Sequence, residues 1–249
     1  MTVASRRGRL YGVGVGPGDP ELLTLKALRI LKAAPVIAYP ASDSGPSIAR
    51  RIVEGHLPAG QEEIEILVPM RVDRAPAKDV YDAAAVRIST HLEAGRDVAV
   101  LCEGDPFFYG SFMYLFERLA AHHPVEIVPG ITSINAASAR ALRPLAARND
   151  GFTVIPAPLD DAAIETLIER AEGFAILKLG RHMPRIRALL SRLGLESRSS
   201  YVERATQADE RILPLRRAPD AAPYFALILG YRGSEPALLG LAGDTGDAR

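Results

Sequence analysis

The chain has 249 residues, of which 48% are hydrophobic and 24% charged. This is the composition of an ordinary globular protein, long enough for one large or two modest domains. Thirty basic and thirty acidic residues give a formal net charge of zero, which argues against a large nucleic-acid surface. Cys102 is the single cysteine, so an internal disulfide framework and a cysteine-rich metal site are excluded, and we predict no metal site.

No apolar run approaches the roughly 20 residues that span a bilayer, and no apolar signal core follows Arg6, Arg7 and Arg9. We therefore expect a cytoplasmic protein with neither a membrane nor a nucleic acid as partner. The charge is unevenly distributed, because residues 178–217 hold ten Lys/Arg against four Asp/Glu. A basic second half suits a small polyanionic substrate, and solvated helix faces are the alternative explanation.

In chain order, the first half alternates apolar strand patterns with amphipathic helix patterns. Asp19 is the expected N-cap of the first helix, with Pro20 at its first position. The repeated alternation predicts an α/β fold with a mostly parallel sheet and helices on both faces. The predicted strands are residues 10–15, 35–39, 63–68, 98–102 and 125–128, and the predicted helices are 21–33, 47–55, 78–94, 110–121 and 135–141.

After Leu142 the sequence becomes proline-rich and then starts a second alternation. The short strands at 201–202 and 212–213 are expected to be antiparallel, so the second sheet is predicted to be mixed. We predict an N-terminal α/β domain of residues 1–130 and a C-terminal α/β domain of residues 131–249, with the boundary placed to within about 15 residues. The tail at 244–249 is expected to fray. The other predicted elements are strands at 152–155, 174–179 and 224–229 and helices at 160–171 and 182–193.

Three junctions share one pattern, in which a strand runs into a Gly/Pro-rich turn and then a helix. They span 14–20, 103–110 and 128–133. Such turns place backbone groups at the carboxyl end of a sheet, where open α/β folds bind ligands. The first turn fails the dinucleotide fingerprint, because Pro17 and Asp19 stand where G-x-G-x-x-G requires glycine. A nicotinamide-dependent enzyme is therefore rejected.

In this order and spacing the three turns resemble the tetrapyrrole methylase family, enzymes that methylate cobalamin and sirohaem precursors with S-adenosylmethionine. The resemblance runs from about residue 9 to residue 229. It implies two α/β domains in the tetrapyrrole methylase fold, with S-adenosylmethionine in the cleft between them, S-adenosylhomocysteine as product, and a homodimer.

Five further segments indicate which members of the family the chain resembles most. They are most similar to the members that methylate carbon 20 of precorrin-2 to give precorrin-3A in the aerobic cobalamin pathway. Members that act on the cobalt-bearing substrate of the anaerobic pathway are the near alternative, and another tetrapyrrole-type methylase is a third. The segments are 36–40, 102–116, 145–149, 177–182 and 201–206.

The resemblance also carries the family's donor contacts onto this chain, residue by residue. Leu179 stands where several relatives have methionine and Ala205 where some have glycine, so backbone contacts are implied at both. Glu103, Gly104 and Asp105 match the turn that holds the donor. The full set is Pro17, Glu103, Gly104, Asp105, Phe108, Thr132, Ser133, Leu179 and Ala205.

The substrate of the resembled enzymes carries many carboxylates, which suit bidentate contacts with arginine. The candidate substrate contacts are Tyr39, Arg140, Arg148, Arg181 and Arg185. Solvent-facing helix arginines are the alternative for the four cations.

No catalytic base is assigned from the sequence. Glu103 and Asp105 are candidates, with donor binding or turn capping as competing roles. His182 and Tyr39 are further options, with a structural role as the alternative. Cys102 is expected to be a core side chain, because it lies in a strand with no base nearby.

Two other functions remain open beside the methylation of a tetrapyrrole. The first is a family member that acts on a macromolecule, such as rRNA or a translation factor, and the zero net charge counts against RNA. The second is a non-catalytic module that keeps only the donor site, which degraded turns would favour. The three turns are intact.

Overall fold

The structure, a computed structural model, describes residues 6–42, 45–68, 75–235 and 238. The tail at 244–249, expected to fray, lies outside the described residues. The chain divides into two compact units, Met1–Thr132 and Ser133–Arg249. Each unit is built on a five-stranded sheet of its own.

The sheet of the first unit is parallel throughout, with the strand order β3-β2-β4-β1-β5. This confirms the predicted parallel sheet. β4 lies at its centre and is buried along its whole length, as a strand covered on both faces must be. The strands are β1 Leu10–Gly14, β2 Val36–Ser42, β3 Glu62–Val68, β4 Val98–Cys102 and β5 Val125–Val128.

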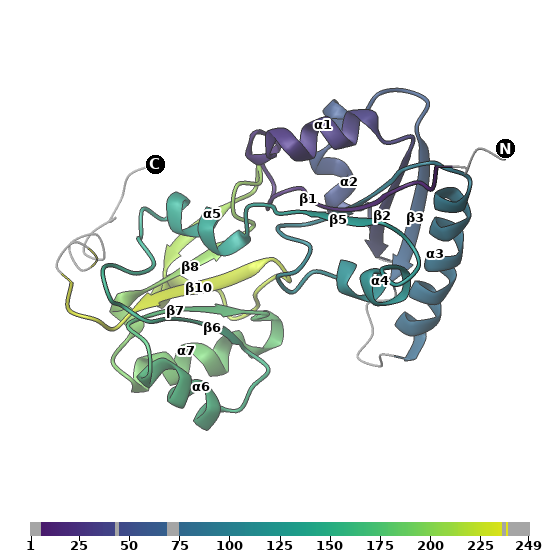
Figure 1. Cartoon of the computed structure of the whole chain (residues 1–249). Helices are drawn as coiled ribbons and strands as arrows, with labels where there is room; N and C mark the ends of the chain where they lie inside the picture. The colour runs from purple at the N-terminus through teal and green to yellow at the C-terminus, as the bar shows by residue number, and fades with distance from the viewer. Residues whose placement is uncertain (1–5, 43–44, 69–74, 236–237, 239–249) are drawn as a thin grey trace, which may run out of the picture. The chain divides into compact units, whose positions relative to one another are not determined.

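Helices cover both faces of this sheet, because side chains along a strand alternate between the faces. α1 and α2 pack on the face that holds Ala99 and Leu101, whereas α3 and α4 pack on the face that holds Val98, Val100 and Cys102. Figure 1 shows the two helix layers. Cys102 therefore belongs to the core, and burial raises the pKa of its thiol. The helices are α1 Leu25–Ala33, α2 Ile48–Ile52, α3 Ala75–Glu93 and α4 Phe112–Leu119.

The first helix begins later than its sequence suggests. Asp19 accepts a hydrogen bond from the Glu21 N–H at 2.8 Å, but it caps only a short 3-10 turn, Pro20–Leu22. Thr24 is the N-cap of α1, and its hydroxyl accepts from the Ala27 N–H at 3.1 Å. Two good capping residues stand close together here. The prediction that Asp19 caps the long helix was wrong.

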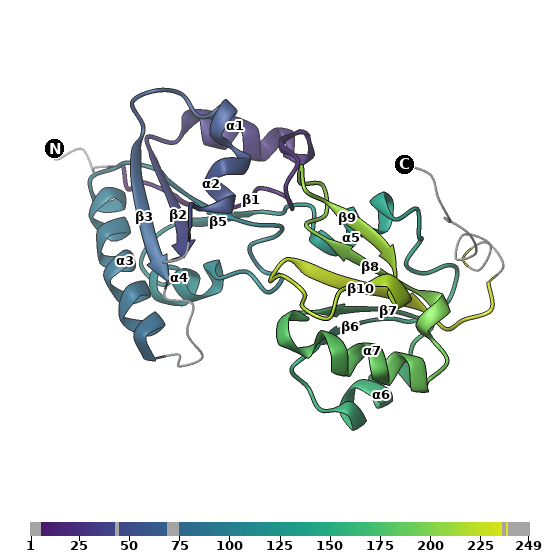
Figure 2. The same cartoon turned by 180° about the vertical axis from the view of Figure 1, so that it is seen from behind.

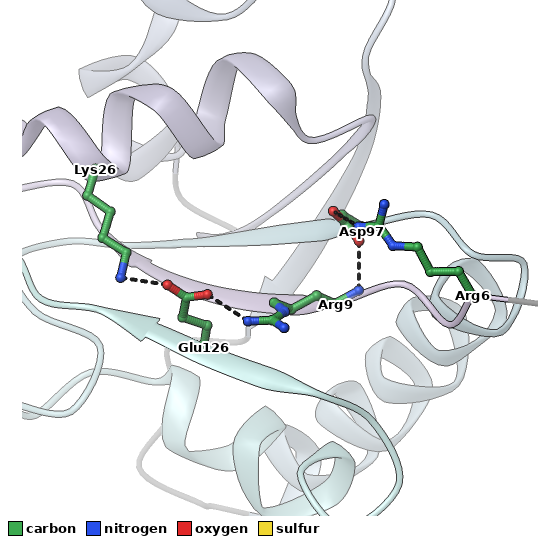
Figure 3. Close-up of polar contacts among 5 residues, drawn as sticks. All are labelled: Arg6, Arg9, Lys26, Asp97 and Glu126. Atoms are coloured by element: carbon green, nitrogen blue, oxygen red, sulfur yellow. Dashed lines mark hydrogen bonds and ion pairs between the residues drawn. The ribbon is translucent and has the colours of Figure 1, made fainter.

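At its amino side, the first sheet is fixed by charged side chains. Figure 3 shows Glu126 of β5 between Lys26 of α1, at 2.6 Å, and Arg9, at 2.9 Å. Hydrogen bonds from these two cations lower the pKa of Glu126. Asp97 accepts from the Arg9 backbone N–H at 2.8 Å and pairs with Arg6. The charges at this side of the sheet thus bond to one another and link the start of β1 to β5 and β4, and β5 to α1.

The sheet of the second unit is mixed, as predicted, with the order β6-β7-β10-β8-β9. β6 and β7 are parallel, and the other three pairings are antiparallel. The antiparallel pairing of β8 with β9 was predicted. The last strand begins two residues later than predicted, at Ala226. The strands are β6 Phe152–Pro156, β7 Gly173–Leu177, β8 Ser199–Glu203, β9 Arg211–Pro214 and β10 Ala226–Tyr231.

Helices also cover both faces of the second sheet (Figure 2). α6 Asp161–Glu169 and α7 Met183–Arg192 pack against Phe174, Tyr201 and Ile228. α5 Ser133–Arg140 packs on the opposite face with Val202 and Leu227. Within the described ranges, neither unit contains a helix of the length and apolarity that crossing a bilayer requires.

Candidate functional site

The three Gly/Pro-rich turns leave three neighbouring strands of the first sheet. β1 lies between β4 and β5 in the strand order, and each strand is followed by one of the turns. Because the strands are parallel, all three turns start from the same edge of the sheet. This is the carboxyl edge, where open α/β sheets bind ligands.

The turns contact one another through glycines. The backbone N–H of Gly104 donates to the Gly16 carbonyl at 2.8 Å, and the Gly16 N–H approaches the Gly104 carbonyl at 3.4 Å. A Cβ placed on Gly130 would lie 2.0 Å from the Gly104 carbonyl oxygen, and a Cβ on Gly14 would lie 2.5 Å from the Gly130 nitrogen. Both distances are shorter than any real contact. The three turns therefore meet only because these positions have no side chain.

Asp105 links two of the turns. Its Oδ1 accepts from the Phe107 N–H at 2.9 Å, and its Oδ2 accepts from the Gly130 N–H at 3.1 Å. A charged acceptor stabilises such bonds more than a neutral one does. The carboxylate thus caps its own turn and holds the turn that follows β5.

Glu103 follows β4 directly, and its side chain faces α2. The Ala49 N–H donates to Glu103 Oε1 at 3.2 Å. Burial raises the pKa of the Glu103 carboxyl, and this bond opposes the rise. A carboxyl with a raised pKa holds a proton more readily than an exposed glutamate.

The other predicted donor residues of the first unit lie at the same edge. Pro17 is buried within the first turn, and Phe108, within the second, is 37% exposed. Thr132 ends the first unit, and Ser133 is the first residue of α5. Gly104 has φ of +65°, a conformation that glycine adopts without strain.

Besides Ser133, the second unit contains two predicted donor residues, and both lie in strained turns. Leu179 is fully buried in the core, so any ligand meets its backbone, as the resemblance implies. It lies between Lys178, with φ of +60°, and Gly180, with φ of +38°. Ala205 is likewise buried, between Arg204 with φ of +50° and Thr206 with φ of +66°.

Positive φ at a residue other than glycine costs free energy and often marks a functional site. Five of the six such residues in the described chain are a predicted site residue or stand next to one. Leu142 is the exception. The six are Tyr109, Leu142, Arg148, Lys178, Arg204 and Thr206.

The four candidate arginines differ in what they bind. Arg185 pairs with Asp161 and donates to two backbone carbonyls, so its guanidinium holds the second unit together. Arg140 pairs with Glu210 at 2.8 Å, and Arg148 lies 3.4 Å from Glu235. Arg181 is exposed and makes no ion pair within the described ranges. Of the four candidates, Arg181 is therefore the one whose charge is not neutralised by a carboxylate in the described residues.

Tyr39 and His182 were considered as bases. Burial and a hydrogen bond with Glu63 raise the pKa of Tyr39 to about 12, so the phenol stays protonated at neutral pH. Burial, and then the charges of Arg181 and Arg185, lower the pKa of His182. Its imidazole is therefore neutral at pH 7 and able to accept a proton.

A cavity of about 550 Å³ lies elsewhere in the first unit, between α3 and the segment that follows α4. His123 lies in its wall, with Nε2 2.8 Å from the Ser89 hydroxyl and with Nδ1 buried without a partner. Burial lowers the pKa of His123, which keeps the ring neutral. The cavity shares no residue with the three turns. Across the described residues, no group of three or more His, Cys, Asp or Glu is placed to hold a metal ion.

Of the residues that hold the turns in place, Gly104 and Asp105 were singled out from the sequence, but others were not. Gly14 and Gly130 were noted only as parts of turns, and their contact depends on the strand order. Glu203 is 4% exposed, and its Oε2 lies 2.8 Å from the Tyr201 hydroxyl. These two residues are two apart on one strand, so they share a face. That spacing is the signal that points to the pair.

Comparison with known proteins identifies a family pattern in most of the chain. The pattern described as "Tetrapyrrole (Corrin/Porphyrin) Methylases" matches residues 9–218. This range includes all three turns and every predicted donor residue.

Three named proteins have similar sequences. Cobalamin biosynthesis protein CobIJ of Mycobacterium tuberculosis is 42% identical over 94% of this chain, but the chain spans only about half of that relative, 48%. Precorrin-2 C(20)-methyltransferase of a Sinorhizobium species is 41% identical over 89% of this chain and 94% of its own length. Cobalt-precorrin-2 C(20)-methyltransferase of Salmonella typhimurium is 32% identical over 89% and 95%.

A solved structure shares the fold. Uroporphyrin-III C-methyltransferase of Thermus thermophilus, crystallised with S-adenosylhomocysteine, superposes with a TM-score of 0.67. It is 30% identical, and the match covers 90% of this chain and 92% of that one.

We predict that Gly130→Ala destabilises the first unit, because the new methyl group would overlap the Gly104 carbonyl oxygen. The expected loss in the free energy of unfolding is about 3 kcal/mol, measured by urea denaturation. Gly55→Ala is the control, since nothing lies within 4 Å of a Cβ there, and it should change stability by less than about 0.5 kcal/mol. Equal stability of the two variants would contradict the contact.

We predict that Asp105→Ala weakens the binding of S-adenosylhomocysteine about tenfold and lowers the unfolding free energy by about 2 kcal/mol, because two backbone N–H groups lose a charged acceptor. Calorimetry and urea denaturation measure the two effects. Asp160→Ala is the matched control, because Asp160 also accepts a backbone N–H, at 2.8 Å, as the N-cap of α6. It should cost about 1 kcal/mol with no change in affinity. If Asp105→Ala bound S-adenosylhomocysteine with unchanged affinity, this turn would have no role in holding the donor.

Proposed function

The chain belongs to the tetrapyrrole (corrin/porphyrin) methylases, and from this premise we propose that it methylates carbon 20 of precorrin-2, with S-adenosylmethionine as donor, to give precorrin-3A in cobalamin biosynthesis. The similarity to the Sinorhizobium enzyme over nearly the whole length of both chains supports the choice of substrate. The observation that carries the proposal is the meeting of three turns at one edge of the first sheet.

The residues at this edge fit the donor in two respects. Glycines at 14, 104 and 130 let the three turns meet without side chains between them, so that their backbone groups are gathered at one place. Asp105 adds a carboxylate, which suits a ligand with a sulfonium and an ammonium group, and Glu103, whose pKa burial raises, adds a second acid to the same turn. The proposal includes contacts from the second unit at Ser133, Leu179 and Ala205.

S-adenosylmethionine supplies a methyl group bonded to a positively charged sulfur, which makes the transfer downhill. The task of the chain is therefore alignment, with the reacting atoms about 3–3.5 Å apart and nearly collinear. The turns orient the donor through backbone groups that the glycine contacts hold in place. Arg181 binds a substrate carboxylate.

Any proton that leaves the methylated carbon needs an acceptor. His182 is one candidate, because its lowered pKa leaves the ring neutral. Tyr39, with its pKa of about 12, stays protonated and is suited to donate a hydrogen bond.

The cobalt-bearing form of the substrate is the second candidate. The similarity to the Salmonella enzyme over most of both chains supports it, at lower identity than the Sinorhizobium one.

The proposal extends to a homodimer in the cytoplasm. Family resemblance supports the dimer. The single cysteine, buried as a free thiol, suits a reducing compartment.

Calorimetry with S-adenosylhomocysteine and with NAD tests the donor, and we expect binding of the first alone. Incubation with precorrin-2 and S-adenosylmethionine should add one methyl group, which NMR locates at carbon 20. The same assay with the cobalt-bearing substrate separates the two candidates by their kcat/KM. Methylation at another carbon, or no binding of S-adenosylhomocysteine, would refute the proposal.

We predict that Arg181→Ala raises the KM for the tetrapyrrole about tenfold, because one carboxylate loses its cation, while the affinity for S-adenosylhomocysteine stays unchanged. Arg170→Ala is the control, since Arg170 is also exposed in the second unit, at the C-cap of α6. The same KM in both variants would show that Arg181 is a solvated surface cation.

A further inference from the structure

The turn around Ala205 is held in a strained conformation by the largely buried carboxylates of Glu203 and Glu210, and the exposed carboxylate of Asp209 also pairs with Arg204, at 2.8 Å. Arg204 and Thr206, on either side of Ala205, both have positive φ, at +50° and +66°. Each such residue costs of order 1–3 kcal/mol, and it persists only where the surroundings over-determine it. Since two of the three residues 204–206 are strained, specific partners must hold this turn in place.

Glu210 is the first of these partners. Its Oε2 accepts from the Thr206 backbone N–H at 2.6 Å. Arg140 of α5 holds the same carboxylate through Nε and Nη2, both at 2.8 Å from Oε1. The side chain of Glu210 is only 11% exposed, so solvent screens this arrangement weakly. The carboxylate thus fixes the far side of the turn to α5.

Glu203 is the second partner. It ends β8, where it pairs with Arg211 of β9 and with Ala226 of β10. Its Oε1 accepts from Arg204 Nη1 at 3.2 Å, and its Oε2 lies 3.5 Å from Arg211 Nη1. The Tyr201 hydroxyl donates to the same Oε2 at 2.8 Å. The near side of the turn is therefore fixed to the sheet.

Ala205 lies between the residues that these carboxylates hold, and its own backbone takes no part in their contacts. Its methyl group packs in the core with Val202 and Leu229. The Arg204 N–H donates to the Phe225 carbonyl at 2.7 Å, and the Gln207 N–H donates to the Arg204 carbonyl at 2.9 Å. The Ala205 N–H and carbonyl, by contrast, have no hydrogen-bond partner anywhere in the described chain. A buried polar backbone group without a partner is costly unless a ligand completes it.

We propose that Glu203 and Glu210 are positioning residues, which hold the strained turn Arg204–Thr206 so that the Ala205 backbone hydrogen-bonds the methyl donor. The inference rests on the proposed function, because it takes S-adenosylmethionine as the ligand of this turn. Neither acid touches the donor. They act through the conformation of the residue between them.

The main test is a cycle of variants in the full chain, read by calorimetry with S-adenosylhomocysteine. Glu210→Ala removes the acceptor of the Thr206 N–H and should raise the dissociation constant about tenfold. Glu210→Gln keeps an oxygen acceptor at that place and should retain most of the affinity. Thr206→Gly in the Glu210→Ala background should restore affinity to within about threefold, because glycine adopts positive φ without strain.

Two controls separate positioning from general destabilisation. Glu165→Ala removes a carboxylate that pairs with Arg192 at 3.4 Å, and it should leave donor affinity unchanged. Glu210→Ala should raise the KM for the donor, but neither the KM for the tetrapyrrole nor kcat at saturating donor. Glu203→Gln keeps an acceptor for Tyr201 but loses the charge facing Arg204 and Arg211. Like Glu210→Ala, it should raise only the KM for the donor.

Three results would overturn the proposal. The first is an unchanged donor affinity in Glu210→Ala, and the second is a loss that Thr206→Gly does not reduce. The third is an equal loss in Glu165→Ala. If the unmodified protein itself binds no S-adenosylhomocysteine, the proposed function fails, and this inference fails with it.

Discussion

The contact between Gly14, Gly104 and Gly130 is the constraint on which the rest of the first unit depends. Three chain segments that leave adjacent parallel strands approach there to distances that no Cβ permits. The approach brings the N–H of one turn to the carboxylate of another, between Gly130 and Asp105. Without it, the carboxyl edge of the sheet would carry three separate turns. With it, the edge is a single backbone surface of fixed shape, which is what the alignment of a reactive ligand needs.

Most of the fold could be predicted from the sequence, because the local signals agree with the global arrangement. The buried apolar run at β4 and the amphipathic helices are readable one by one. The errors lie where two local signals compete. Asp19 and Thr24 are both good N-caps, and the choice between them depends on the extended backbone at Leu23 and Thr24, which packing decides.

The candidate site was less predictable, because its geometry depends on strand order and on backbone strain. The sequence contains the three glycine turns, but it does not show that β1 lies between β4 and β5. Positive φ can be anticipated at Gly104, because glycine adopts it freely. Nothing local anticipates it at Lys178, Arg204 or Thr206, because these residues rarely adopt it. Their conformation follows from tertiary contacts that a single sequence does not reveal.

The two units give their turns a fixed shape in opposite ways. In the first unit, turns are shaped by leaving side chains out, at glycines that let backbones touch. In the second, a turn is forced on residues that resist it and is held by carboxylates at its two sides, Glu203 and Glu210. The first solution fails when any side chain is added. The second fails only when a particular acceptor is lost, and a glycine at Thr206 would make that acceptor dispensable.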